Sequence, residues 1–228
     1  MMEYLIPIGI LALLGLMAFL LTRSNKNATK LLQELAKQEN WEYTKKNGTF
    51  DGLFEFKGQF NPEQSWTLTA FDRASENRLN TSNLTSNVSG PYTEWSISLP
   101  SIKTELFMMP KDPSMKMVNE EKLLQMLKPI WKSMGLNADQ WVQYKSSDSD
   151  IQNAYLILSD QPELAQKLFS SAFEENLKPL AQLNFGLRPA FRVQNGKAEV
   201  QIRKVLRKPE EIKDLVRLGI VFSETCIK

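Results

Sequence analysis

Residues 191–202 read FRVQNGKAEVQI, and this stretch decides the kind of fold that the chain adopts. Apolar side chains take every second position on each side of a central dipeptide: Phe191, Val193, Ala198, Val200 and Ile202. The dipeptide is Asn195-Gly196, and its residues tolerate the positive φ angles of the two-residue turns that join antiparallel strands. The stretch therefore predicts a β-hairpin with one apolar face.

Alternating patterns of the same kind occur nearer the N-terminus. Residues 66–71 and 94–99 alternate as half-buried strands should, and residues 49–60 carry phenylalanines punctuated by glycines. Residues 106–109 indicate one more strand, and residues 28–40 have the apolar spacing of an amphipathic helix. Because these strands follow one another without helical crossovers, they predict an antiparallel meander.

Helices and strands alternate in the C-terminal half. A helix is expected over residues 119–134, a strand over 154–158, and a helix from Asp160 that restarts near Pro179. A last helix opens at Pro209. The predicted fold class is α+β, with antiparallel sheet or sheets and helices packed on one face. The pattern leaves open whether there is one core or two similar-sized subdomains.

Polar joints divide the chain into three predicted parts. Residues 1–23 would form a transmembrane anchor, and residues 24–110 an amphipathic helix with a β-rich unit. Within that unit, residues 75–91 are rich in Asn, Ser and Thr and predict a long mobile loop. Residues 111–228 would form an α+β unit of helix, strand, helix, hairpin and helix.

The anchor rests on residues 4–22, which read YLIPIGILALLGLMAFLLT and contain no charge. As a helix they would extend about 28 Å, near the thickness of the hydrocarbon core of a bilayer. The alternative is a cleaved signal peptide, which needs a positive N-terminal region and a small-x-small cleavage site. The chain has Glu3 before the apolar run and no such site after it. A single-pass transmembrane helix is therefore the expectation.

Flanking charge predicts the orientation. Arg23, Lys26 and Lys30 follow the apolar run, so the positive-inside rule places the N-terminus outside and the following residues in the cytoplasm. The single cysteine, Cys226, cannot form an intrachain disulfide, which agrees with a reducing compartment. The predicted location is the cell membrane, with the folded part on the cytoplasmic side.

Composition removes several classes of chemistry. The chain has 228 residues, no histidine and one cysteine, so Ser-His-Asp and Cys-His nucleophiles, histidine zinc sites and thiolate clusters are excluded. No glycine-rich phosphate-binding motif occurs. The net charge of +2 is too small for the whole molecule to favour a polyanion. We therefore assign no catalytic, cofactor-binding or metal-binding residue and expect a protein that is not an enzyme.

Carboxylates are the remaining candidates for chemistry. Asp51, Glu55, Asp72 and Glu94 lie on or beside predicted strands and would form an acid/base pair if two of them converged. Charges that face solvent from a strand are the commoner arrangement. Asp148-Ser149-Asp150 would supply oxygen ligands to a cation, but the residues that follow do not complete a calcium loop.

One cluster of basic residues stands out between the hairpin and the last helix. Residues 203–208 read RKVLRK and contain Arg203, Lys204, Arg207 and Lys208 without an acid among them. Near anionic lipid, each cation would contribute about 1 kcal/mol of attraction. These residues are the candidate contact for an anionic surface or a partner, and the alternative is a solvated connection. Aromatic residues are not interleaved with them, so nucleic acid is not expected.

The layout resembles a known kind of protein. A hydrophobic N-terminus, a short amphipathic helix, the strand start Trp41-Glu42-Tyr43 and the run NAYLILSDQPELA at 153–165 precede the hairpin and the final helix. In this order they resemble uncharacterised bacterial single-pass membrane proteins with an α+β domain of unknown function. The resemblance implies a bacterial origin and a non-enzymatic role, and it implies no site residue.

Three functions are left open, in order of preference. The first is a membrane-tethered, non-catalytic interaction or structural protein that binds a partner protein on the cytoplasmic face. The second is a small-molecule or lipid-binding module with an apolar pocket between sheet and helices. The third is an enzyme that uses only carboxylate, lysine or tyrosine chemistry.

Overall fold

The computed structural model describes residues 27–46, 53–71, 91–112, 139–169 and 172–227, with five separate positions between 122 and 129. The strands are β1 Glu42–Lys45, β2 Phe54–Asn61, β3 Gln64–Phe71, β4 Tyr92–Ser98, β5 Leu106–Pro110, β6 Val142–Tyr144, β7 Tyr155–Ser159, β8 Ala190–Gln194 and β9 Lys197–Ile202. The helices are residues 27–38, α3 Ser149–Ala154, α4 Pro162–Phe169, α5 Ala172–Ala181, the 3-10 helix η3 Phe185–Leu187 and α6 Pro209–Ile227.

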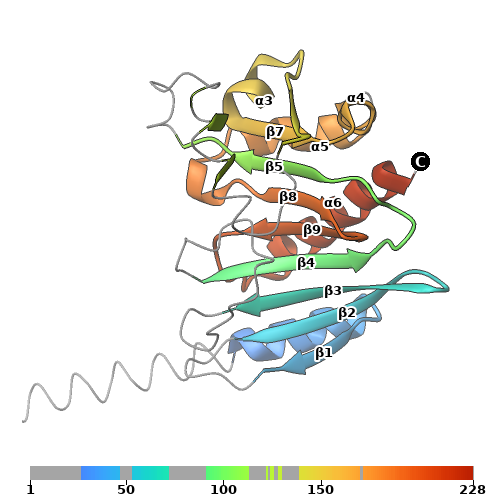
Figure 1. Ribbon diagram of the computed structural model, residues 1–228. Coiled ribbons are helices and arrows are strands. Elements are labelled where there is room, and N and C mark those ends of the chain that lie inside the picture. The colour runs from blue at the N-terminus through green and yellow to red at the C-terminus, as the bar shows by residue number, and fades with distance from the viewer. Residues whose placement is uncertain are drawn as a thin grey trace, which may run out of the picture.

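The described strands form one sheet in the order β1-β2-β3-β4-β9-β8-β5-β7-β6, and each pairing is antiparallel (Figure 1). Strands β1 to β4 follow chain order, as the predicted meander requires. The hairpin of β8 and β9 then joins β4, with Trp95 opposite Val200. Because β4 and β9 come from the two predicted units, the sheet is continuous across both. The two predicted units therefore share one sheet.

The predicted fold class needs a correction, because the structure does not show the transmembrane helix that it included. No helix within the described part of the chain is both long enough and apolar enough to cross a membrane. Residues 4–22, on which the prediction fell, lie outside the described residues, as do residues 75–90 of the predicted loop. What the structure shows is an α+β fold with one large antiparallel sheet.

The hairpin forms as its sequence predicts. Asn195 has a φ angle of 51° and Gly196 a φ angle of 68°, which is the left-handed region that this tight turn demands. The turn also contacts the neighbouring strand, because the Leu99 N–H donates to the Gly196 carbonyl at 2.6 Å. Local turn chemistry thus fixes the register of β8 against β9, and the Leu99 hydrogen bond joins the turn to the end of β4.

Both faces of the sheet carry apolar side chains. The larger core lies on the face that the helix over residues 27–38 and helices α3 to α6 cover, and it includes Trp66, Trp95, Phe191 and Phe222. The second, smaller cluster lies on the opposite face and consists of Phe107, Trp141, Leu156 and Leu158, with Leu124 packed against it. Most of the described helices therefore cover one face of the sheet, while the helical residue Leu124 packs on the other.

The last helix, α6, packs directly on the centre of the sheet. It starts at Pro209, as predicted, and buries the expected residues Ile212, Leu215, Val216, Gly219 and Phe222. Gly219 allows the closest approach, since a Cβ atom there would lie 2.3 Å from Cδ2 of Trp95. Trp95 has no exposed surface, so the glycine and the indole ring fit against each other without spare space.

Helices α4 and α5 differ from the expectation in their boundaries. The predicted restart near Pro179 is wrong, because α4 ends at Phe169 and α5 runs from Ala172 to Ala181 with Pro179 inside it. A proline near the end of a short helix removes only one hydrogen bond, which the packing of Phe173 and Leu177 in the main core outweighs. Helix α4 begins at Pro162, two residues after the expected start at Asp160, and the Asp160 carboxylate accepts the Glu105 N–H at 2.8 Å.

Candidate functional site

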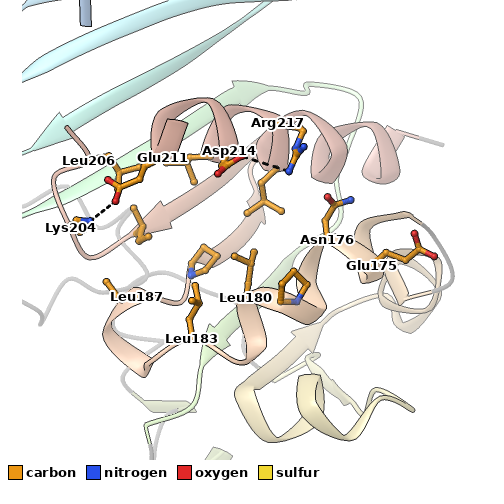
Figure 2. A pocket seen from close by; sticks show the side chains of 15 residues that line it. Glu175, Asn176, Leu180, Leu183, Leu187, Lys204, Leu206, Glu211, Asp214 and Arg217 are labelled. Atoms are coloured by element: carbon orange, nitrogen blue, oxygen red, sulfur yellow. Dashed lines mark hydrogen bonds and ion pairs between the residues drawn. The ribbon is translucent and has the colours of Figure 1, made fainter. Parts of the chain in front are cut away.

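An apolar groove of about 500 Å³ lies between α5 and α6 (Figure 2). Helix α6 forms one side, and α5 with the segment after it forms the other. The lining residues are Glu175, Asn176, Pro179, Leu180, Leu183, Leu187, Pro189, Ile202, Lys204, Leu206, Glu211, Asp214, Leu215, Arg217 and Leu218. Volumes of 300–1,000 Å³ with mostly apolar walls are typical of small-molecule sites.

The helical repeat explains why α6 presents this wall. Glu211, Leu215 and Leu218 recur at intervals of four and three residues, so they lie on one side of the helix. This side is next to the stripe that packs on the sheet. From Glu211 to Leu218 the helix rises about 10 Å, which sets the length of the groove along α6.

The opposite wall exposes apolar surface to solvent. Leu183 and Leu187 are 37% and 40% exposed, and they are two of the five large hydrophobic side chains that are exposed in the described part of the chain. Both follow α5 and line the groove. Single exposed leucines are ordinary, but two that face a common hollow indicate a binding surface.

Charged groups mark the two ends of the groove. Figure 2 shows the Lys204–Glu211 ion pair at one end, and the distance between Nζ and Oε1 is 2.9 Å. Glu175 and Asn176 lie at the other end, where the Arg217–Asp214 pair is at 3.7 Å and mostly exposed. An apolar middle between polar ends suits a ligand that is itself apolar with a polar end.

Pro179 interrupts the backbone hydrogen bonding of α5 beside the groove. Because proline has no N–H, the carbonyl of Glu175, four residues earlier, lacks its usual donor within α5. Both residues line the groove. The side chains of Glu175 and Asn176 make this end of the groove polar.

The four basic residues of the predicted contact do not all line the groove. Lys204 lines the groove, whereas Arg207 lines a small hollow beside Ala28, Thr29 and Tyr43. Burial lowers the pKa of Arg203, and the nearby Asp112 carboxylate opposes that effect. Lys208 precedes α6 and is exposed. Whether they contact an anionic surface or a partner stays a prediction.

The strand carboxylates are held by cations. Glu55 pairs with Lys46 at 2.7 Å and Lys57 at 3.6 Å. Burial alone would raise the pKa of Glu55, but the hydrogen bond and charge of Lys46, with the charge of Lys57, lower it below its usual value. A carboxylate with a lowered pKa is a poor proton donor at neutral pH. Asp51 and Asp72 lie outside the described residues.

A second ionic group lies further along the same face of the sheet. Glu94 pairs with Lys197 at 3.7 Å, and Lys197 also contacts Glu199. Glu199 binds Arg192 across the β8–β9 hairpin, and both of these side chains are buried. Burial lowers the pKa of Arg192 to about 10, which leaves it charged at neutral pH. The group is a compensated structural network.

Asp148 has a local structural role. Its carboxylate accepts the N–H groups of Asp150 and Ile151 and thereby caps α3. Lys178 lies 3.6 Å from the same carboxylate. Among the described residues, no group of three acids, cysteines or histidines could hold a metal ion. Burial raises the pKa of Cys226 to about 12, so its thiol is unreactive at neutral pH.

Sequence reasoning missed the groove because its walls come from segments far apart in the chain. The sequence around Leu183 and Leu187 contains a hint of the groove. These two leucines lie in the connection from α5 to β8, where neither the helical nor the strand spacing of apolar residues predicts burial in the core. Lys204 was chosen for its charge, and the structure shows that it also lines the groove.

Comparisons with known proteins give a distant structural similarity and no sequence match. No family model matches the chain, and no curated protein matches it. Among solved structures, the crystal structure of the mycobacterial trehalose monomycolate transport factor A, TtfA, is similar with a TM-score of 0.47 and 9% sequence identity. The match covers 87% of this chain and 93% of that one. A similarity at this level identifies no shared site and no shared activity.

Proposed function

We propose that the protein is a non-catalytic binding protein that takes the apolar part of a small molecule into the groove between α5 and α6. The observation that carries this proposal is the groove itself: about 500 Å³, with leucines and prolines along its middle and charged pairs at its ends. Transfer of apolar surface from water to such a groove favours binding by about 25 cal/mol for each Å² removed from water.

The positions of the carboxylates support a binding role over catalysis. Glu55 and Glu94 are held by lysines, and Asp148 caps a helix. Each of these acids therefore has a structural task. Recognition of a partner protein, a cytoplasmic location and contact with a membrane remain predictions from the sequence.

Binding of a neutral solvatochromic dye to the full chain tests the proposal. Leu183→Asp and Leu187→Asp each place a charge in the groove. Because both leucines are partly exposed, these substitutions should change the stability of the fold only slightly. Each variant loses the apolar contact between one leucine and the dye, which is worth about 1.5 kcal/mol of binding free energy. The affinity for the dye should therefore fall about tenfold.

The matched control is Leu31→Asp. Leu31 is 49% exposed on the helix over residues 27–38 and does not line the groove. This variant should bind the dye as the wild type does. The apolar run 4–22 is common to all these chains, so the difference between them reports on the groove. Equal binding by all four chains would contradict the proposal.

A further inference from the structure

One end of the groove lies close to the place where the N-terminal residues join the folded part. Arg207 lines a small hollow with Ala28 and Thr29, which belong to the first turn of the helix over residues 27–38. Leu206, the residue before Arg207, lines the groove. The chain that precedes this helix therefore joins the folded part near the Leu206 end of the groove.

The contacts around Leu206 hold this arrangement in place. The buried Thr93 hydroxyl donates to the Lys204 carbonyl at 2.8 Å and accepts the Leu206 N–H at 3.0 Å. Just beyond the other end of the N-terminal helix, Glu39 pairs with Lys213 of α6 at 3.9 Å. The N-terminal helix thus lies beside the start of α6, and the strand β4 fixes the connection that leads from it to the groove.

A long apolar segment precedes this helix in the chain. Residues 4–22 contain no charge, and residues 23–26, which read RSNK, link them to the helix. Four extended residues span up to about 14 Å. Contact of an apolar segment with water is unfavourable, and the groove itself exposes Leu183 and Leu187. Two apolar surfaces are therefore joined by a short polar linker.

Resting on the proposed function, we propose that the apolar run 4–22 of the same chain occupies the groove in water and that a ligand binds by displacing it. Because the run enters at the Leu206 end, its last seven residues reach the groove first. As a helix, seven residues extend about 10 Å, which matches the length of the groove along α6. Leu16, Phe19 and Leu20 recur at intervals of three and four residues and would face the groove together.

The short linker makes weak contacts sufficient for this docking. A flexible linker of a few residues gives the attached segment an effective concentration of about 1 mM. A run that binds with a dissociation constant of about 0.1 mM then fills the groove in roughly nine chains of ten, and the apparent affinity of a competing ligand falls about tenfold. The run therefore regulates access to the groove.

Disulfide trapping in the full chain tests the docking. The chain is made by cell-free synthesis without membranes, with Leu20→Cys in the run and Leu187→Cys in the groove, on the side toward Leu206 (Figure 2). The native Cys226 is buried, and burial raises its pKa to about 12, so it stays out of the reaction. Mild oxidation with diamide should link the two introduced cysteines within one chain, as measured by mass spectrometry of the linked peptides.

The matched control combines Leu20→Cys with Leu31→Cys. Leu31 is 49% exposed, similar to the 40% of Leu187, and it does not line the groove. Since Leu31 is nearer to Leu20 along the chain, a run that stays outside the groove would link to Leu31→Cys at least as often. A docked run should link to Leu187→Cys about fivefold more often or better. An excess of neutral dye should reduce the Leu187→Cys link and leave the Leu31→Cys link unchanged.

Charges in the run give a second measurement that leaves the folded part untouched. Leu16→Asp with Phe19→Asp should release the run and raise the affinity of the full chain for the dye about tenfold. Leu5→Asp with Ile6→Asp is the control. It places the same charges in the part of the run that lies beyond the groove, and it should leave the affinity unchanged.

The outcomes separate this inference from the proposed function. Equal linking of Leu187→Cys and Leu31→Cys, or a dye affinity that both double variants leave unchanged, would overturn the docked run. Links between two chains would overturn it as well, because they would place the run of a second copy in the groove. Dye binding that is indifferent to Leu183→Asp would overturn the proposed function, whatever the run does.

Discussion

Replacement of Gly219 by alanine tests the packing that holds one wall of the groove in place. A Cβ atom at this position would lie 2.3, 2.4 and 2.7 Å from Cδ2, Cε3 and Cε2 of Trp95. Ordinary van der Waals contacts between carbon atoms are about 3.5–4.0 Å, so either α6 or the indole ring must move by about 1 Å or more.

The indole ring has little freedom to move. Trp95 is fully buried, and its ring centroid lies 6.5 Å from that of Trp66, which itself contacts Trp41 at 5.0 Å. Overpacking of this kind costs about 1–3 kcal/mol. Alanine would return up to about 1 kcal/mol through its better helix propensity. The net expectation is a loss of stability of about 1–2 kcal/mol.

Urea and thermal unfolding measure this loss in the full chain. For a domain of this size, each kcal/mol corresponds to a fall in Tm of about 2–4 °C. The control is Gly186→Ala, because a Cβ atom at Gly186 would meet no atom within 4 Å. Gly186→Ala should leave stability unchanged or raise it slightly. If Gly219→Ala proves as stable as the wild type, α6 does not pack on Trp95 as described.

Two further substitutions test the turn and the helix cap. Gly196→Ala should lower the stability by about 1–2 kcal/mol. The φ angle of 68° is unfavourable for alanine, and the new Cβ atom would lie 3.1 Å from Cα of Pro100. An unchanged urea midpoint would refute the turn geometry. Asp148→Ala should cost about 1 kcal/mol at pH 7 through loss of the cap. The hydrogen bond from the Ile151 N–H lowers the pKa of Asp148, whereas burial acts in the opposite direction. The Asp150 N–H and the charge of Lys178 lower the pKa further. A lowered folded-state pKa means that the ionised carboxylate stabilises the fold above its unfolded pKa of about 4 and loses this effect as the pH falls. The difference between Asp148→Ala and wild type should therefore shrink from pH 7 to pH 3, and an equal difference at both would contradict this role.

Local chemistry explains which elements could be predicted from the sequence. Asn195-Gly196 requires positive φ angles, and this alone specifies the β8–β9 hairpin. Pro209 and the apolar spacing after it specify α6. Both features depend on a few neighbouring residues, so no knowledge of the rest of the chain is needed.

Pairing between distant strands could not be predicted in the same way. β5 lies between β7 and β8, and β4 lies beside β9 about 100 residues later in the chain. Alternation of apolar residues shows that a strand has a buried face, but it does not name the partner strand. The single sheet therefore follows only from the structure.

The candidate site depends on the same long-range arrangement. Leu183 and Leu218 line one groove although 34 residues separate them between α5 and α6. The predicted basic cluster illustrates a related point, because neighbours in sequence line different hollows: Lys204 lines the groove, and Arg207 lines the hollow beside Tyr43. In an irregular connection, the backbone sets the direction of each side chain, and charge in the sequence does not reveal it.

Methyl NMR of the full chain with labelled leucines tests the central claim most directly. On addition of a neutral alkyl ligand, the methyl signals of Leu183, Leu187 and Leu218 should shift together, because these side chains line the groove. The signals of Leu35 and Leu68, which are buried in the main core away from it, should stay in place. If the groove methyl signals do not move while the ligand binds elsewhere on the chain, the groove is not the binding site.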